Sequence, residues 1–273
     1  MLKKVLFVAG GVTIGVVGAP MIKQAIARLR PAATALSGQS AIAEGNMTNR
    51  AAAILSRRID DEVARNILVL GGTEPLGTCI LKQLIEARDT ETYPAKIGAI
   101  SALTQMPNGL VELENKIRII QGDLHNADIL DNALENQAVV IFNLHHNAAG
   151  SEGMQHMNKW IAERKETALK RLVLISSLDV NQEENTTPEV VDKRTNENLL
   201  RNGPFSMQDN SDYVIVRPGR LGSDEVKNVY KASESFIASD NTVSRGDVSH
   251  FIVNKVILGH VGDEFSKKTY HVV

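Results

Sequence analysis

The sequence predicts an α/β fold in which helices cover both faces of a doubly wound parallel sheet. First, short apolar runs alternate with helical patterns from residue 66 onward, which is typical of strand–helix–strand units. Second, residues 66–87 read as a strand, a glycine-rich turn and a helix. Third, 273 residues can bury one large core and still leave an N-terminal extension.

The glycine-rich turn at 71–77 opens this α/β region. Residues 67–70 are an apolar run typical of a strand buried on both faces, and apolar residues recur at helical spacing within 78–87. In dinucleotide-binding units such a turn brings the backbone close to a pyrophosphate at the start of the helix. If a cofactor binds, the expected contacts in this turn are Gly71, Gly72, Thr73 and Gly77.

The middle position of this turn carries Glu74 in place of glycine. Its carboxylate would lie where the cofactor phosphates rest, and like charges a few ångströms apart repel by about 1 kcal/mol in water. Pro75 also removes one backbone N–H. The turn therefore predicts the fold more strongly than the ligand, and a turn that only joins strand to helix is the alternative.

Charge and cysteine content exclude several classes of function. The net charge of −2 argues against nucleic acid as a partner, although residues 1–58 hold eight basic residues and one acidic residue. Cys79 is the single cysteine, so we expect no intrachain disulfide and a buried structural thiol. The adjacent pair His145-His146 cannot share one face, and no metal-ligand spacing occurs. We therefore expect no metal site.

The N-terminal segment is apolar and flanked by basic residues. Residues 5–22 contain no charge, and as a helix they would span about 27 Å, close to the roughly 30 Å of a bilayer core. A cleaved secretory signal, an organelle targeting segment and a retained anchor are the three alternatives. We favour the retained anchor, and Gly11-x-x-x-Gly15 within it is a spacing that lets a second helix approach.

These patterns predict three parts. Residues 1–30 form an apolar and basic helix that anchors or targets the chain, residues 31–63 form a linker arm, and residues 64–273 form the α/β domain. Further strands are expected at 96–101, 117–121, 138–143, 172–177, 213–216 and 270–273. Further helices are expected at 127–135, 152–169, 190–201 and 247–258. A Met and Trp stripe in the second of these helices is expected to be core.

With these elements placed, residues 65–273 resemble the atypical, NmrA-like branch of the short-chain dehydrogenase/reductase superfamily, which has an NAD(P)-binding Rossmann fold. Besides the glycine turn, the resemblance rests on short motifs that end strands or open helices. They are Gly122-Asp123-Leu124, Ser176-Ser177, Lys193-x-x-x-Glu197, Arg217-Pro218-Gly219 and Ser244-Arg245-Gly246-Asp247-Val248.

The resemblance implies that Asp123 and Leu124 lie near the adenine of a bound cofactor. It also implies that Ser177 and Lys193 are vestiges of a catalytic set that needs a tyrosine four residues before the lysine. Glu189 stands there instead. The alternative for the Lys193 motif is an exposed i, i+4 pair with Glu197.

The cofactor selector expected at the end of the second strand is also missing. Residues 101–104 provide neither the acid that favours NAD nor an arginine that favours NADP. No cofactor is expected, or NADP(H) if any.

The sequence therefore favours a non-catalytic member of this superfamily. By analogy with relatives in respiratory complex I and photosystems, we expect an accessory subunit or assembly factor of an organellar membrane complex. Residues 1–60 would contact the complex and the lipid bilayer, in the mitochondrial inner membrane or alternatively the plastid thylakoid. Two alternatives remain open: a membrane-anchored NADP-dependent oxidoreductase, and a soluble regulator that senses NADP without chemistry.

Overall fold

A computed structural model describes residues 8–9, 12–13, 64–90, 97–143, 149–164, 167–208, 211–237, 242–259 and 265–273. The chain divides into two compact units, Met1–Asp60 and Asp61–Val273. In the first unit, β1 (Val8–Ala9) and β2 (Val12–Thr13) pair antiparallel.

The helix predicted over residues 5–22 is not confirmed: these four positions are strands, and the rest of that segment lies outside the described residues. The physical reason lies in the local sequence. Val8, Val12 and Thr13 are β-branched and favour strands. Within the part of the chain that the structure describes, no helix is both long and apolar enough to cross a bilayer.

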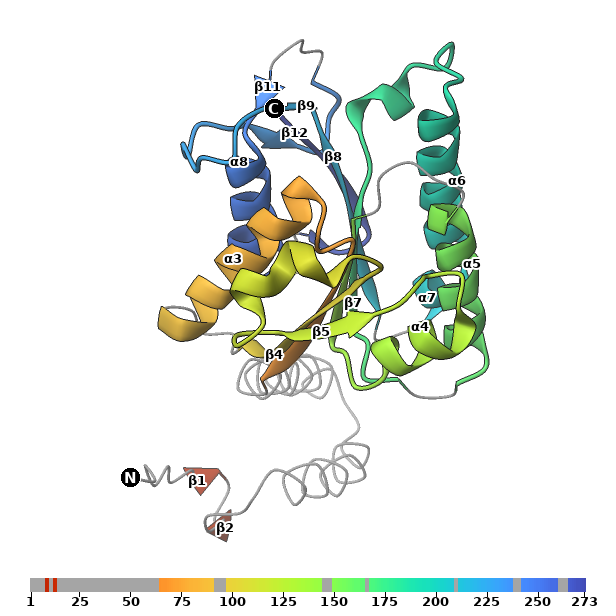
Figure 1. The fold of residues 1–273 in the computed structure, drawn as a ribbon. Helices are drawn as coiled ribbons and strands as arrows, with labels where there is room; N and C mark the ends of the chain where they lie inside the picture. The colour runs from red at the N-terminus through yellow and green to blue at the C-terminus, as the bar shows by residue number, and fades with distance from the viewer. Residues whose placement is uncertain are drawn as a thin grey trace, which may run out of the picture. The chain divides into compact units, whose positions relative to one another are not determined.

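The second unit is built on an eight-stranded sheet in the order β10-β12-β8-β7-β6-β3-β4-β5 (Figure 1). Its strands are β3 (Arg65–Leu70), β4 (Ile97–Thr104), β5 (Arg118–Gln121), β6 (Val139–Phe142), β7 (Arg171–Ile175), β8 (Asp212–Pro218), β10 (Ala232–Ser233) and β12 (Lys268–Val272). All neighbours pair parallel except β10 with β12. The predicted doubly wound α/β fold is confirmed.

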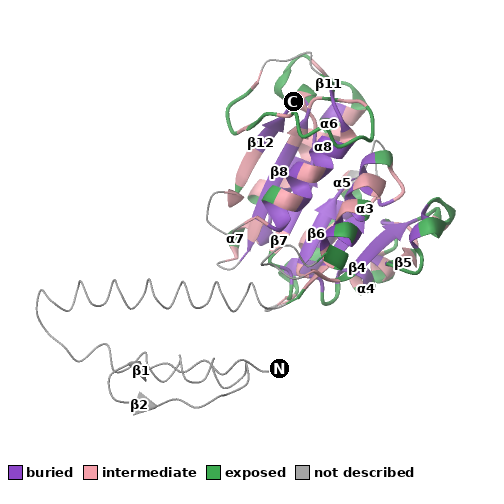
Figure 2. Cartoon of the chain, turned by 90° about the vertical axis from the view of Figure 1, so that its left-hand side faces the viewer, coloured by how far each residue is buried: buried purple, intermediate pink, exposed green. Residues whose placement is uncertain are grey.

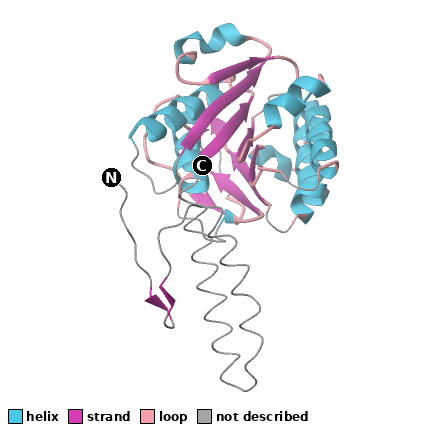
Figure 3. Cartoon of the chain, turned by 90° about the horizontal axis from the view of Figure 1, so that it is seen from below, coloured by secondary structure: helices cyan, strands magenta, loops and turns pink. Residues whose placement is uncertain are grey.

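Helices cover both faces of this sheet (Figures 1 and 3). One face carries α3 (Pro75–Thr90), η2 (Pro107–Leu113), α8 (Arg245–His250) and η4 (Phe251–Ile257). The other carries α4 (Ala127–Leu134), α5 (Ala149–Ala162), α6 (Pro188–Asn202) and α7 (Pro204–Met207). Alternate strand residues feed the two cores, with Ile67 and Val69 in one and Leu68 and Leu70 in the other. The central strands are accordingly buried on both faces (Figure 2).

Two helices differ from the prediction. Helix α5 ends at Ala162, and the guanidinium of Arg164 donates to the Trp160 carbonyl at 3.1 Å and stacks over its ring. The stripe that contains Trp160 is buried, which confirms that it is core.

The second difference is at the late helix, which is α-helical only to His250 and then becomes the π-helix η4. The carbonyls at its end accept hydrogen bonds from outside the helix. Arg65 Nη1 donates to Ile257 O at 3.1 Å, and Arg171 Nη1 donates to Val256 O. Both arginines stand at the start of strands.

Candidate functional site

The glycine turn between β3 and α3 keeps the tight backbone of a dinucleotide-binding loop. Gly71 has φ 79°, a backbone conformation that residues other than glycine rarely adopt. A Cβ added to Gly77 would lie 2.2 Å from Gly71 O, so only glycine lets helix and turn pack this closely. The Thr78 hydroxyl donates to Gly72 O at 3.0 Å and fixes the turn from the helix side.

Thr73 ties the turn to the end of β4. Its hydroxyl lies 3.0 Å from the hydroxyl of Thr104, which also accepts from Met106 N. Strand β4 runs through Thr104, three residues beyond its predicted end, so the first residue after the strand is the neutral Gln105. This residue is neither the acid that binds a ribose hydroxyl nor an arginine for a 2′-phosphate.

Glu74 occupies the residue before α3, and it decides how well an anionic cofactor fits. Its N–H donates to Gly71 O at 3.2 Å and its carbonyl accepts from Thr78 N at 2.8 Å, so its backbone is committed to the turn and the helix. Pro75 then begins the helix with no N–H. The backbone shape fits a diphosphate, but the half-exposed carboxylate at Glu74 does not, because both groups are negative.

A cavity of about 200 Å³ lies beside the turn, at the carboxyl ends of β6, β7 and β8. Parallel α/β sheets place their ligand sites at this edge. The polar residues that line it are Asn143, Ser176, Ser177, Asp179, Glu189, Lys193 and Arg220. The apolar residues and the glycine are Leu76, Ile175, Pro218, Gly219 and Leu221. The structure thus brings Ser177 and Lys193, both singled out from the sequence, to one cavity.

Lys193 is held by Glu189 in this cavity. Its Nζ lies 2.7 Å from Glu189 Oε1, one helical turn earlier in α6. The Lys193 side chain is 12 % exposed and the Glu189 side chain 40 %. Glu189 thus occupies the lysine at the position where a tyrosine phenol could donate a proton.

Ser177 is committed to local structure. Its hydroxyl accepts from Asp179 N at 3.1 Å and caps the short helix η3 (Leu178–Asn181). The same hydroxyl donates to Asp179 Oδ2 at 3.3 Å. These bonds occupy the hydroxyl that would have to bind a reacting oxygen.

Glu197 is not part of an exposed pair with Lys193, so that alternative is wrong. Glu197 is 3 % exposed and accepts from Arg217 Nε at 2.8 Å and from Arg217 Nη2 at 2.5 Å. Arg201 Nη2 adds a bond at 3.3 Å. Burial alone would raise the pKa of Glu197, but the hydrogen bonds and positive charge of Arg217 outweigh burial and lower it.

This buried pair was missed by sequence reasoning because the two residues lie on different elements, α6 and β8. Arg217 also donates through Nη1 to Asn181 Oδ1 at 2.5 Å. The only signal was the Arg-Pro-Gly motif at the end of β8. The Glu197–Arg217 pair therefore lies next to Ser176, a residue that lines the cavity.

Asp123 and Leu124 follow β5 and have different environments. Asp123 Oδ1 accepts from His125 N at 3.0 Å, and this bond is the main cause that lowers the Asp123 pKa. Leu124 is 9 % exposed and packs in the core with Phe142 and Leu130. Asp123 is thus available at the surface, whereas Leu124 mainly serves packing.

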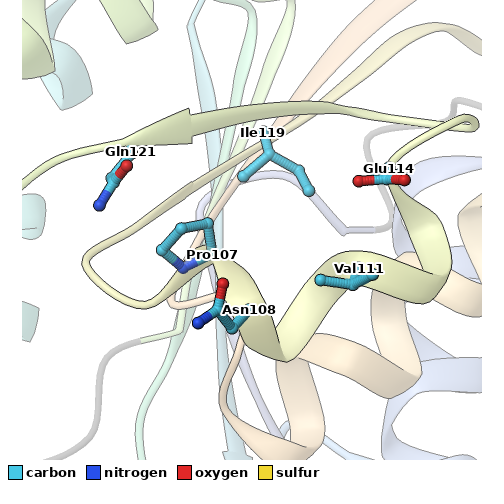
Figure 4. A pocket seen from close by; sticks show the side chains of 6 residues that line it. All are labelled: Pro107, Asn108, Val111, Glu114, Ile119 and Gln121. Carbon is cyan, nitrogen blue, oxygen red and sulfur yellow. The ribbon is translucent and has the colours of Figure 1, made fainter.

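The hollow beside β5 and the cysteine of α3 offer no catalytic set. A hollow of about 430 Å³ lies between η2 and β5 (Figure 4). It is lined by Pro107, Asn108, Val111, Glu114, Ile119 and Gln121, so Glu114 is its one ionisable group and no acid–base pair faces it. Cys79 is half-buried, not fully buried as expected, and burial raises its pKa. Among the residues described, no cluster of three or more His, Cys, Asp or Glu could hold a metal ion. His145-His146 lies outside them.

Comparison with solved structures identifies the same fold in bacterial proteins. A short-chain dehydrogenase/reductase from Veillonella parvula DSM 2008 is 19 % identical, with a TM-score of 0.59 over 77 % of this chain and 94 % of that chain. The structure of that protein in complex with NADP has a TM-score of 0.57 to this chain, at the same identity and coverage. ChuY, an anaerobillin reductase from Escherichia coli O157:H7, is 15 % identical, with a TM-score of 0.60 over 76 % of this chain and 96 % of that chain.

Sequence comparison identifies the family. No curated protein sequence matches the chain. The model of the NAD(P)H-binding family matches residues 71–256, which include the glycine turn and the cavity. The chain belongs to the NAD(P)H-binding family and has the Rossmann-like fold of the short-chain dehydrogenase/reductases.

Proposed function

We propose that this protein is a non-catalytic member of its family that serves as an accessory subunit or assembly factor of an organellar membrane complex. The observation that carries the non-catalytic part is the 2.7 Å pair between Lys193 and Glu189 in the cavity. The lysine that would lower the pKa of a catalytic phenol instead neutralises a carboxylate. The second argument against catalysis is Glu74, whose carboxylate replaces the middle glycine of the turn that would receive the cofactor phosphates.

The membrane part of the proposal rests on the N-terminal sequence. The uncharged run at 5–22 and the excess of basic residues through 58 are features of anchors and organelle targeting segments. Residues 1–60 would contact subunits of the complex and the lipid bilayer. The mitochondrial inner membrane is the favoured location and the plastid thylakoid the alternative. Complex I-like and photosystem-like assemblies are the corresponding partners.

Coenzyme binding and turnover test the non-catalytic proposal. The melting temperature of the full-length protein is measured with millimolar NADPH or NADH, and oxidation of the coenzyme is followed with quinone and aldehyde substrates. A ligand at one hundred times its Kd stabilises a protein by about 2.7 kcal/mol. We expect no such shift and no turnover. Turnover would refute the proposal, and binding without turnover would favour a regulator that senses NADP.

A membrane-anchored NADP-dependent oxidoreductase is the second candidate. The retained backbone of the glycine turn favours it, since Gly71 keeps φ 79° and Gly77 keeps its close packing. On this candidate, Asn143, Ser177 and Lys193 would face the substrate and another group would supply the proton. Turnover that is lost in a Lys193→Met variant would favour this candidate.

A further inference from the structure

A relay of hydrogen bonds connects the wall of the cavity to the C-terminal strand; Glu197 and His271 in it are buried, whereas Asn181 and Ser235 are exposed. It begins at the Glu197–Arg217 pair described above and passes through Asn181, the last residue of η3. It continues to His271 in β12 and ends at the carbonyl of Ser235, just beyond β10. The relay therefore joins side chains of α6, β8, η3 and β12 to the backbone just after β10.

His271 sits at the centre of this relay and is 4 % exposed. Its Nδ1 lies 3.1 Å from Ser235 O, and its Nε2 lies 3.2 Å from Asn181 Nδ2. A carbonyl only accepts, so Nδ1 carries the hydrogen and Nε2 must accept from the amide. The ring of Phe236 stands edge-on to the imidazole, with centroids 5.7 Å apart.

The orientation of Asn181 is fixed by its other partner. Arg217 Nη1 donates to Asn181 Oδ1 at 2.5 Å, and a guanidinium has no acceptor. A flip of the amide would set two donors against each other. Each donor in the relay therefore meets an acceptor only when Nε2 of His271 carries no hydrogen, which means that His271 is neutral.

A proton on Nε2 would break this order. The imidazolium N–H would face the Asn181 NH₂ group, and a second positive charge would lie near Arg217 of β8. Glu197 of α6 partly compensates, but burial and Arg217 dominate and lower the His271 pKa.

The other charged groups around β12 are paired elsewhere. Arg201 of α6 binds Thr269, on the same side of the strand as His271. Glu234 binds Lys268 and Tyr270 on the opposite side. None of these groups offers a carboxylate to an imidazolium at position 271.

We propose that the hydrogen bond between His271 and Asn181 is a latch: proton uptake by His271 breaks it, releases the end of η3 from β12 and so couples acidification to the wall of the cavity. Helix η3 carries Ser177 and Asp179 at its start, and both line the cavity. Loss of the bond to Asn181 therefore frees the end of η3, whereas Nδ1 of His271 keeps its bond to Ser235 O. This coupling holds whether or not the protein binds a coenzyme.

Hydrogen exchange of the full-length protein tests this latch. Backbone amides of 178–182 are compared at pH 7.5 and pH 4.5 after correction for intrinsic exchange rates. We expect at least a tenfold loss of protection at pH 4.5 in the wild type and no pH-dependent loss in His271→Gln, which stays neutral. His250→Gln is the matched control, because burial also lowers the pKa of His250 but this histidine does not contact η3, and this variant should behave like the wild type.

Equal protection at both pH values in the wild type would overturn the proposal, as would a loss that persists in His271→Gln. If that variant does not fold, the His271 ring is titrated by NMR in the wild type. Titration well below the value of an exposed histidine, together with shifts of the Asn181 side-chain amide, supports the latch. Titration at or above that value overturns it.

Discussion

Replacing Glu74 with glutamine tests whether one charge keeps a diphosphate out of the glycine turn. Glutamine keeps the size of the side chain and removes its charge. The backbone bonds of residue 74 to Gly71 and Thr78 do not involve the side chain, so the turn should persist. We expect Glu74→Gln to bind NADPH more tightly than the wild type.

The gain can be worked from Coulomb's law. At about 6 Å, two unit charges repel by about 0.7 kcal/mol in water and about 2.8 kcal/mol at an effective dielectric constant of 20. Because Glu74 is half-exposed, the lower part of this range applies. Two phosphate charges then cost about 1.4–3 kcal/mol, which is roughly a 10- to 150-fold change in Kd. The same substitution removes a favourable charge at the start of α3, worth about 0.3–1 kcal/mol of stability.

Isothermal titration with NADPH and with inorganic pyrophosphate measures the affinity, and urea unfolding measures the stability. Glu86→Gln is the matched control, because Glu86 is exposed on the same helix but lies near its far end. Glu86→Gln should change the Kd for NADPH and the Kd for pyrophosphate by no more than about twofold. Equal affinity of the wild type and Glu74→Gln, with both folded, would refute the electrostatic argument.

Three further outcomes are expected. Gly77→Ala places a methyl 2.2 Å from Gly71 O and should lower the free energy of unfolding by at least about 1–3 kcal/mol in urea. Glu197→Gln leaves the Arg217 charge buried without its counterion and should cost about 3–5 kcal/mol. Since the Glu197 pKa is lowered from 4.5, wild-type stability should be full above that pH and fall below it, and this acid sensitivity should shrink in the variant. Deletion of residues 1–31 should release the protein from membranes at unchanged melting temperature; a truncated protein that still sediments at high salt would contradict the anchor.

Much of the fold could be predicted because its signals are local. The apolar run of β3, the turn at Gly71 and the helical spacing of α3 are contiguous in sequence, and together they define a strand–helix unit. Burial on both faces makes the central strands continuous apolar runs, which are easy to recognise.

The site was less predictable because its partners come from different elements. The sequence placed Glu197 next to Lys193 by helical spacing, but the sheet brings Arg217 against Glu197 from β8. Lys193 then pairs in the opposite direction along α6, with Glu189. Helical spacing alone allows Lys193 to pair with either Glu189 or Glu197. Arg217 of β8 decides between them, because it binds Glu197 and leaves Glu189 to Lys193.

The arginines at the starts of β3 and β7 have a consequence for how this domain can deform. Arg65 and Arg171 grip the last carbonyls of η4, and Arg171 also holds Asp212 at the start of β8 with Nε–Oδ2 at 2.7 Å. This clamp lies at the amino ends of the strands, across the sheet from the cavity. These contacts hold the amino ends of the strands together, so η3 can rearrange at the carboxyl ends without breaking them.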